Sequence, residues 1–235
     1  MISIIGVGWV NRRSMGYKDN VRVFDSKKKL PRINRKDIFK ESYKAFGRMD
    51  YFSKLGVAAI VFAMQDANRH DTPPKNTGMI ASSSTGCLET DIKYQATLSR
   101  EKNVLPSPAI FAYTLPSCFL GEASILYGLT GESFIINEDN TTGMTGLGMA
   151  VDLLALGQAD MVLCGINNSD ICNFHDKEIL NTSGALFFVL ENQKSESMDS
   201  YGELNLNTSN HNIYYKDSPI NSLYDLAQRC LKRKL

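Results

Sequence analysis

The segment that most constrains the fold of this chain is residues 131–157, which read GESFIINEDNTTGMTGLGMAVDLLALG. Its apolar run Phe134-Ile135-Ile136 predicts a strand, and a polar stretch, residues 138–142, follows at once. Met144, Leu147, Val151 and Leu154 then recur at helical spacing. Many α/β enzymes hold a nucleophile where a strand leads into a helix, because free backbone N–H groups and the helix dipole stabilise a developing anion there.

The rest of the chain shows the same alternation of strand and helix patterns. At 235 residues it is long enough to bury about three quarters of its unfolded surface in one α/β domain. Apolar runs predict strands at 2–10, 76–83, 159–165 and 183–191, with a weaker one at 201–209. Helices are expected at 51–68, 85–99, 116–127 and 222–234, and the first of these is apolar on nearly every side, as in a buried helix. Residues 11–50 predict a surface loop with short helical turns.

Charge is distributed unevenly along the chain. The formal net charge is +1, but residues 12–50 hold 13 Lys or Arg against five Asp or Glu, a net charge of +8. The remaining residues carry a net charge of −7. A basic segment on an otherwise acidic protein favours an anionic partner, although a solvated surface connection explains the pattern equally well.

Several site classes have no signal in this sequence. The five cysteines, at 87, 118, 164, 172 and 230, lack the CxxC or Cys/His spacing of a zinc site, and no phosphate-binding glycine motif is present. No apolar stretch reaches about 18 residues without a charge. We therefore expect a cytoplasmic protein with reduced thiols, no metal, no cofactor, and neither nucleic acid nor a membrane as partner.

Three longer motifs resemble one family. They are SPAIFAYTLPSCFLGEASILYGLTGESFIINEDNTTG at 107–143, QADMVLCGINN at 158–168 and SGALFFVLE at 183–191. In order and spacing they resemble the β-ketoacyl synthase branch of the thiolase-like condensing enzymes, and a similar Arg-Met-Asp-x-Phe run leads into the first long helix of those enzymes. The resemblance covers about residues 1–191 and implies the N-terminal half of such an enzyme: an α/β, βαβαβαββ unit with a mixed five-stranded sheet and helices on both faces.

The resemblance also implies a domain organisation. Residues 1–191 are expected to form the ketosynthase-like domain, with residues 12–50 as a basic insertion in it. Residues 192–235 are expected to be a C-terminal extension packed on the same domain.

The acyl-accepting cysteine of the family falls on Asn140 when the motifs are laid over this chain without a gap. An amide does not form a thioester, so no catalytic residue is assigned. Cys87 could serve as a substitute nucleophile and His175 as a base. A packing role for Cys87 and a surface position for His175 are favoured over these. The resemblance implies a catalytically inactive, chain-length-factor-like subunit that forms a heterodimer with an active β-ketoacyl-ACP synthase in bacterial fatty acid, polyketide or polyene biosynthesis. A malonyl-ACP decarboxylase and a homodimeric acyl-binding scaffold remain alternatives.

Two further sets of residues follow from the resemblance. Five residues are expected at the subunit interface or along an acyl tunnel, with ordinary core packing as an equal alternative for each: Phe111, Tyr113, Leu115, Phe119 and Leu120. Three basic residues are expected to dock an acidic acyl carrier protein: Arg32, Arg35 and Lys36.

Overall fold

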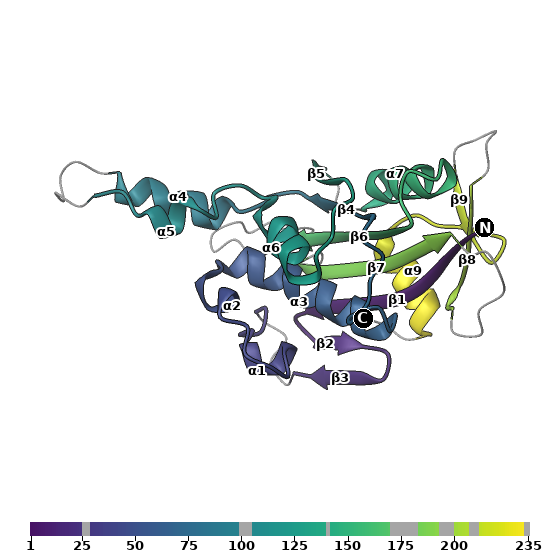
Figure 1. Cartoon of the computed structure of the whole chain (residues 1–235), viewed down its shortest axis with the longest axis horizontal. Helices are drawn as coiled ribbons and strands as arrows, with labels where there is room; N and C mark the ends of the chain where they lie inside the picture. Colours follow the sequence, from purple (N-terminus) through teal and green to yellow (C-terminus); the bar gives the residue numbers. More distant parts are fainter. Residues whose placement is uncertain are drawn as a thin grey trace.

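A single sheet forms the centre of the molecule (Figure 1). The computed structural model describes residues 1–24, 29–98, 105–139, 142–169, 183–192, 200–206 and 212–232. Within these ranges ten strands join in one sheet, in the order β10-β9-β8-β1-β7-β6-β4-β5, with β2 paired to β1 and β3 paired to β2.

Five of these strands make the predicted mixed core. They are β1 (Ile2–Asn11), β4 (Thr77–Ser83), β5 (Ser133–Asn137), β6 (Met161–Asn168) and β7 (Gly184–Asn192). β4 runs parallel to both β5 and β6, whereas β7 runs antiparallel to β6 and to β1. The α/β class with a mixed sheet is therefore confirmed.

The sheet is wider than the expected five strands because β1 has partners on both of its sides. Residues 2–4 of β1 pair with β8 (Gly202–Leu206), and residues 8–10 pair with β2 (Ser14–Tyr17). β3 (Asn20–Val23) completes a hairpin with β2, while β9 (Ile213–Tyr215) and β10 (Ser218–Pro219) continue the sheet beyond β8. The prediction of a surface loop after β1 was wrong for this hairpin, since the free edge of β1 supplies backbone partners that a local pattern does not reveal.

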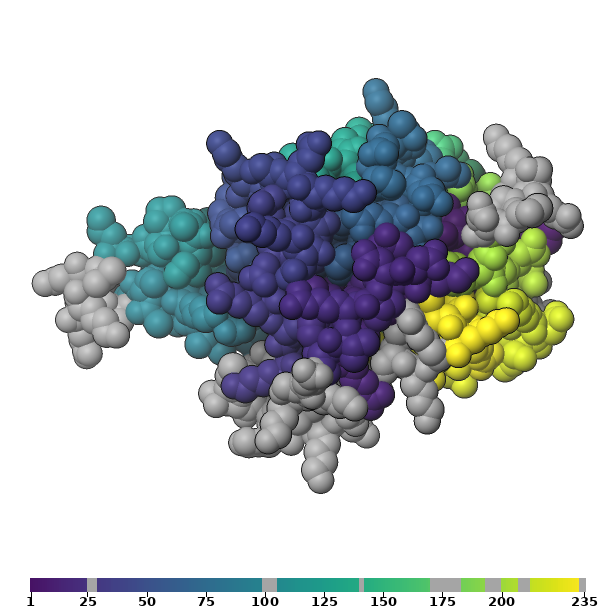
Figure 2. Space-filling view, turned by 90° about the horizontal axis from the view of Figure 1, so that it is seen from below, coloured from purple at the N-terminus to yellow at the C-terminus, as the bar shows by residue number. Residues whose placement is uncertain are grey.

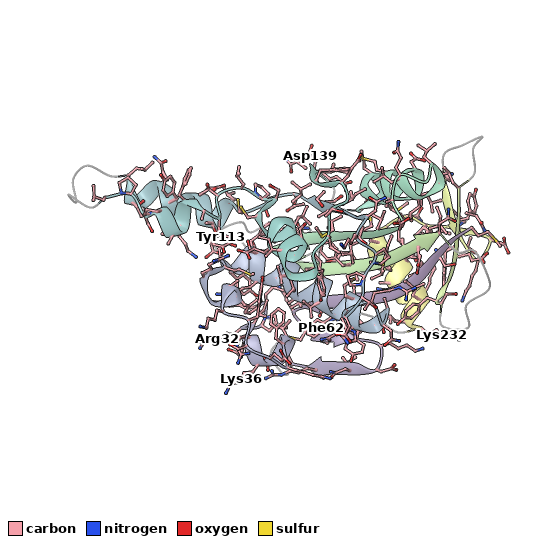
Figure 3. The ribbon with its side chains drawn as sticks, in the orientation of Figure 1. Arg32, Lys36, Phe62, Tyr113, Asp139 and Lys232 are labelled. Atoms are coloured by element: carbon pink, nitrogen blue, oxygen red, sulfur yellow. The ribbon has the colours of Figure 1, made fainter. Side chains whose placement is uncertain are left out.

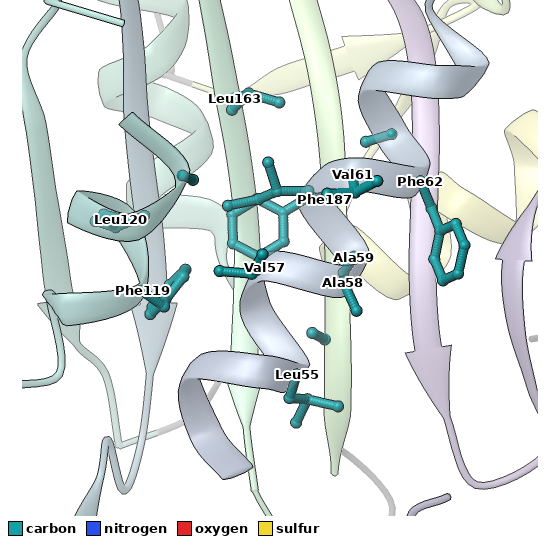
Figure 4. Close-up of a cluster of buried hydrophobic side chains, with 14 of the residues drawn as sticks. Leu55, Val57, Ala58, Ala59, Val61, Phe62, Phe119, Leu120, Leu163 and Phe187 are labelled. Carbon is teal, nitrogen blue, oxygen red and sulfur yellow. The ribbon is translucent and has the colours of Figure 1, made fainter. Parts of the chain in front are cut away.

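One face of the sheet is covered by α3 (Tyr51–Asp66) and α6 (Cys118–Tyr127). Helix α3 approaches β1 closely because Gly8 has no side chain: a Cβ there would lie 2.2 Å from the backbone nitrogen of Ala63. Side chains from α3 and α6 meet Phe187 of β7 and Leu163 of β6 in this core (Figure 4). The predicted buried helix at 51–68 is confirmed. Helix α3 contacts the sheet on one side and α6 on another.

The opposite face is covered by α7 (Met144–Ala155) and α9 (Leu223–Leu231). The buried side chains of α7 that pack there are Leu147, Ala150, Val151 and Leu154. Those of α9 are Leu223, Leu226, Ala227 and Cys230. Ser222 begins α9 by accepting a hydrogen bond from the backbone N–H of Asp225 at 3.1 Å, as its N-cap position predicts. Helices therefore lie on both faces of the sheet.

Two further groups of short helices lie outside these layers. Helices α4 (Leu88–Thr97) and α5 (Pro108–Phe111) form an arm that extends past the sheet at one end of the molecule (Figure 1). Helices α1 (Arg35–Ile38) and α2 (Ala45–Arg48) lie with the β2–β3 hairpin on the face seen in Figure 2. In the described ranges, no helix has the length and apolar character needed to cross a bilayer.

Candidate functional site

The candidate site lies where β5 ends and α7 begins, at the carboxyl ends of the parallel strands. Ligand sites of open α/β sheets commonly lie at this edge. Asn140 and Thr141 fall outside the described residues, so the site is built from the residues around them: Glu138, Thr142 and Gly143. We call this β5-to-α7 connection, residues 138–143, the elbow.

Glu138 connects the elbow to two neighbouring elements. Its Oε1 accepts a hydrogen bond from the hydroxyl of Ser82 on β4 at 3.0 Å, and its Oε2 accepts one from the backbone N–H of Gly143 at 3.0 Å. The backbone N–H of Glu138 also donates to the carbonyl oxygen of Ser83 at 3.1 Å. A carboxylate therefore lies at the start of α7, where the helix dipole favours negative charge.

The start of α7 needs a glycine. Gly143 is the N-cap residue, with φ of 72°, and a Cβ there would lie 2.5 Å from Leu223 Cδ1 of α9. Thr142 contributes through its hydroxyl oxygen, which accepts a hydrogen bond from the backbone N–H of Met144 at 3.4 Å. Thr142 thus makes a capping contact at the start of the helix, one position before the N-cap residue.

Polar side chains also gather at the ends of β4 and β6. Asn168 Oδ1 accepts hydrogen bonds from Ser83 Oγ at 3.1 Å and from the backbone N–H of Ser84 at 3.0 Å. Asn168 is buried, and its Nδ2 makes no hydrogen bond with the described part of the chain. These contacts hold the turn after β4 against the end of β6, beside the elbow.

The thiols in the described residues are poor nucleophiles. Burial, with Asp91 as the next cause, raises the pKa of Cys87 to about 12, so this thiol stays protonated near neutral pH. Burial also raises the pKa of Cys118 and of Cys164 above the ordinary value. Cys172 and His175 lie outside the described residues. Cys87 consequently fits the packing role better than that of a substitute nucleophile.

The five residues expected at an interface or tunnel separate into two environments. Phe119, Leu120 and Tyr113 are buried, and Phe119 packs edge-on against Phe52 of α3 with ring centroids 5.6 Å apart. Phe111 and Leu115 are instead 60% and 65% exposed. The two exposed residues remain candidates for a subunit contact, while the three buried ones support the domain from inside.

A buried carboxylate that the sequence analysis missed lies beside Tyr113. Glu122 Oε1 accepts a hydrogen bond from the Tyr113 hydroxyl at 2.7 Å and pairs with Arg48 Nη2 at 3.3 Å. Burial, followed by the hydrogen bond to Glu122, raises the pKa of Tyr113 to about 12. Arg48 belongs to the Arg-Met-Asp run at residues 48–50. Asp50 of this run caps α3 by accepting a hydrogen bond from the backbone N–H of Ser53 at 2.8 Å. The run therefore joins α2, α3 and α6.

The basic residues expected to dock a carrier protein lie around α1. Arg32 and Lys36 are exposed, whereas Arg35 is half-buried and donates from Nη1 to the carbonyl oxygen of Glu41 at 2.5 Å. In Figure 3, Arg32 and Lys36 lie on the side of the molecule opposite Asp139 of the elbow. Within the described ranges, no group of three or more His, Cys, Asp or Glu side chains is arranged to hold a metal ion.

Sequence comparison connects this chain to one family. Residues 34–175, more than half of the chain, match the model of the β-ketoacyl synthase N-terminal domain. The 3-oxoacyl-(acyl-carrier-protein) synthase 2 of Vibrio cholerae is 29% identical over 127 residues, and that of Rhizobium meliloti is 30% identical over 128 residues. Each match covers 53% of this chain and 30% of the relative, so the chain spans only part of the length of these relatives.

Solved structures with the same fold cover most of the chain. The ishigamide ketosynthase/chain length factor matches with a TM-score of 0.66 at 13% identity, over 86% of this chain and 62% of that one. A ketosynthase in complex with its chain length factor from Xenorhabdus doucetiae matches with a TM-score of 0.58 at 16% identity, over 82% and 79%. A type II polyketide acyl-carrier protein in complex with its ketosynthase matches with a TM-score of 0.64 at 17% identity, over 87% and 67%. At these identities the matches establish the fold.

Proposed function

The chain belongs to the family of β-ketoacyl synthase N-terminal domains, and from this premise we propose that it is a catalytically inactive, chain-length-factor-like subunit. In this proposal it pairs with an active β-ketoacyl-ACP synthase that makes a fatty acid, polyketide or polyene. The observation that carries the proposal is an uncharged sheet edge that has a partner on one side only within the described residues, together with exposed apolar side chains elsewhere on the surface.

That edge is strand β5. Within the described residues it pairs with β4 alone, and its sequence, Ser-Phe-Ile-Ile-Asn, carries no charge. Uncharged edge strands without a bulge or proline are often covered in native proteins, because their free N–H and C=O groups pair readily with another strand. Apolar side chains that are 58–87% exposed lie on the arm, on the residues next to α5 and on α6, the helix that packs near β5: Ile92, Leu105, Phe111, Leu115 and Ile125. Such a surface is typical of a protein–protein contact.

The lack of catalysis is supported by the residues of the elbow. Asn140 stands where the family places its acyl-accepting cysteine, and an amide does not form a thioester there. The Cys87 thiol, with its pKa raised to about 12, does not replace it.

The kind of partner is supported by the similar structures. Two of them are named as a ketosynthase with a chain length factor, and one as a ketosynthase with its carrier protein. The match from Xenorhabdus doucetiae covers 82% of this chain and 79% of the other, so the two chains are similar in length. Docking of an acidic carrier protein on Arg32 and Lys36, with Arg35 beside them, belongs to the same proposal.

Co-expression with an active β-ketoacyl-ACP synthase from the same organism tests the proposal. Size-exclusion chromatography with light scattering is expected to show a one-to-one complex. A chain that forms a homodimer and does not bind the synthase would support the scaffold alternative instead. Release of carbon dioxide from malonyl-carrier protein by the purified chain is expected at the background rate, and a rate above background would reveal a decarboxylase.

A further inference from the structure

A carboxylate that does not belong to helix α7 lies at the start of this helix. The first turn of this twelve-residue helix has no acidic side chain. The Glu138 carboxylate, at the end of β5, lies there instead, with Oε2 3.0 Å from the backbone nitrogen of Gly143. Helix N-termini bind anions because their free N–H groups and the dipole favour negative charge, so this carboxylate occupies the position an incoming anion would take.

We infer that Glu138 is a built-in anion that fills the anion-binding position at the start of α7 and thereby prevents this helix N-terminus from stabilising a thiolate or an oxyanion. This inference deepens the proposed function, because it gives the absence of catalysis a cause that is independent of Asn140. A cysteine placed at the described position 142, beside the start of α7, would then keep an ordinary or raised pKa, since a nearby like charge disfavours its ionised form.

The carboxylate is held in place from two sides. Ser82, which is fully buried, donates its hydroxyl hydrogen to Glu138 Oε1 at 3.0 Å. The backbone of Glu138 is fixed to β4 by the hydrogen bond that its N–H donates to the carbonyl oxygen of Ser83, at 3.1 Å. The charge acts on its neighbours as well: Glu138 adds to burial in raising the pKa of Cys164 on β6. Asp139, which is exposed, places a second negative charge next to the elbow.

Thr142, one position before the N-cap residue of α7, offers a position for a reporter thiol beside the start of the helix. Its Oγ1 already accepts a hydrogen bond from the backbone N–H of Met144, and the residue is only half-buried. The test compares Thr142→Cys with Thr142→Cys/Glu138→Gln. Gln keeps an oxygen that can accept from Gly143 N–H and has nearly the same size, so the charge is the main difference between the two variants.

The measurement is the pH dependence of iodoacetamide alkylation at position 142, read by peptide mass spectrometry so that the native cysteines do not interfere. With Glu138 present, the apparent pKa of the introduced thiol is expected at or above its ordinary value of about 8.5. Without the charge, it is expected to fall by about one unit, which makes alkylation at pH 7 up to about tenfold faster. Identical profiles in the two variants would overturn the inference.

A matched control separates charge from loosening of the elbow. Ser82→Ala in the Thr142→Cys background removes one hydrogen bond to Glu138 but keeps its charge, and the thiol pKa is expected to stay high. A fall in the thiol pKa equal to that of the Glu138→Gln variant would mean that the hydrogen bond, and not the charge, controls the thiol.

Circular dichroism checks that each variant folds, and Glu138→Thr replaces Glu138→Gln if the latter does not fold. None of these readouts involves a partner, so their failure is distinct from failure of the pairing proposal.

Discussion

The side chain of Leu223 lies against Gly143, so that a Cβ added to Gly143 would come within 2.5 Å of Leu223 Cδ1. The backbone N–H of Leu223 also donates to the carbonyl oxygen of Thr142 at 2.8 Å. Helices α7 and α9 therefore begin side by side, and the start of α9 packs against the elbow at Thr142 and Gly143. Residues 80 positions apart in the sequence thus share one contact at the candidate site.

Gly143→Ala is expected to lower the free energy of unfolding by about 2–5 kcal/mol. Part of this cost, about 1–2 kcal/mol, comes from placing a side chain at φ of 72°. The remainder, about 1–3 kcal/mol, comes from overlap with Leu223. Urea unfolding measures the change. In a Leu223→Ala background the same substitution is expected to cost only the first part, and an equal cost in both backgrounds would contradict the overlap.

The Asp66 carboxylate predicts a pH-dependent contribution to stability. Its Oδ2 accepts hydrogen bonds from the Tyr201 hydroxyl at 2.6 Å and from the N–H of Val7 at 2.8 Å, and burial is the main cause that raises its pKa above 3.8. A raised carboxyl pKa means that the folded state binds the proton more readily, so lowering the pH from 7 toward 4 stabilises the fold through this group.

Asp66→Asn isolates that contribution. The stability of the unmodified protein relative to the Asn variant is expected to increase as the pH is lowered, because the variant has no proton to gain at this position. Urea unfolding of both proteins at pH 7 and pH 4 measures this difference, and the contributions of the other carboxylates, which are the same in both proteins, cancel. A difference that is the same at both pH values would show that Asp66 titrates alike in the folded and unfolded states.

Tyr113 is expected to matter more for stability than Arg48, although both contact Glu122. Tyr113→Phe leaves the buried Glu122 Oε1 without its 2.7 Å hydrogen bond, which is expected to cost about 1–3 kcal/mol. Arg48→Gln is expected to cost less, since the guanidinium side chain is 65% exposed and water screens its pairing with Glu122. Thermal unfolding compares the two variants, and the reverse order would assign the main role to the ion pair.

Exposed apolar residues of the arm are expected to control pairing with the synthase. Phe111→Asp with Leu115→Asp should abolish or strongly weaken the one-to-one complex, because a charge is costly to bury at an apolar contact. The core should be unaffected, since both side chains are at least 60% exposed and the ring contact that Phe111 makes, with Tyr94 at 5.3 Å between centroids, lies within the arm. Leu156→Asp, at a residue 71% exposed after α7, is the matched control and is expected to leave pairing intact. Normal pairing by the double variant would place the contact elsewhere.

Carrier-protein binding is expected to depend on the basic residues around α1. Arg32→Glu with Lys36→Glu should weaken binding of an acidic carrier protein by about tenfold at low salt, with a smaller effect at high salt, because exposed charges are screened. Arg35 is left unchanged, since it bonds to the Glu41 carbonyl. Lys232→Glu, at a distant exposed lysine (Figure 3), serves as the control. Unchanged affinity in the double variant would remove docking from the function of this segment.

Local patterns in the sequence determined most of the secondary structure of the core. The apolar run from Tyr51 predicted a buried helix, and α3 is buried on almost every side. Ser222 predicted the start of α9, where its side chain caps the helix. These features depend on spacing, capping and apolar character within a few residues, which a single sequence contains in full. The family motifs likewise predicted the α/β class that the sheet confirms.

The tertiary structure alone decided how distant polar groups and strand edges meet. The β2–β3 hairpin and β8 share the outer side of β1, and nothing in the local pattern of residues 11–24 indicates that pairing. Glu138 accepts a hydrogen bond from Ser82, 56 positions away, and Glu122 accepts one from Arg48, 74 positions away. Such contacts depend on where the whole sheet brings two chain segments together, because hydrogen bonds and side-chain packing act over a few ångströms in space, whatever the separation along the chain.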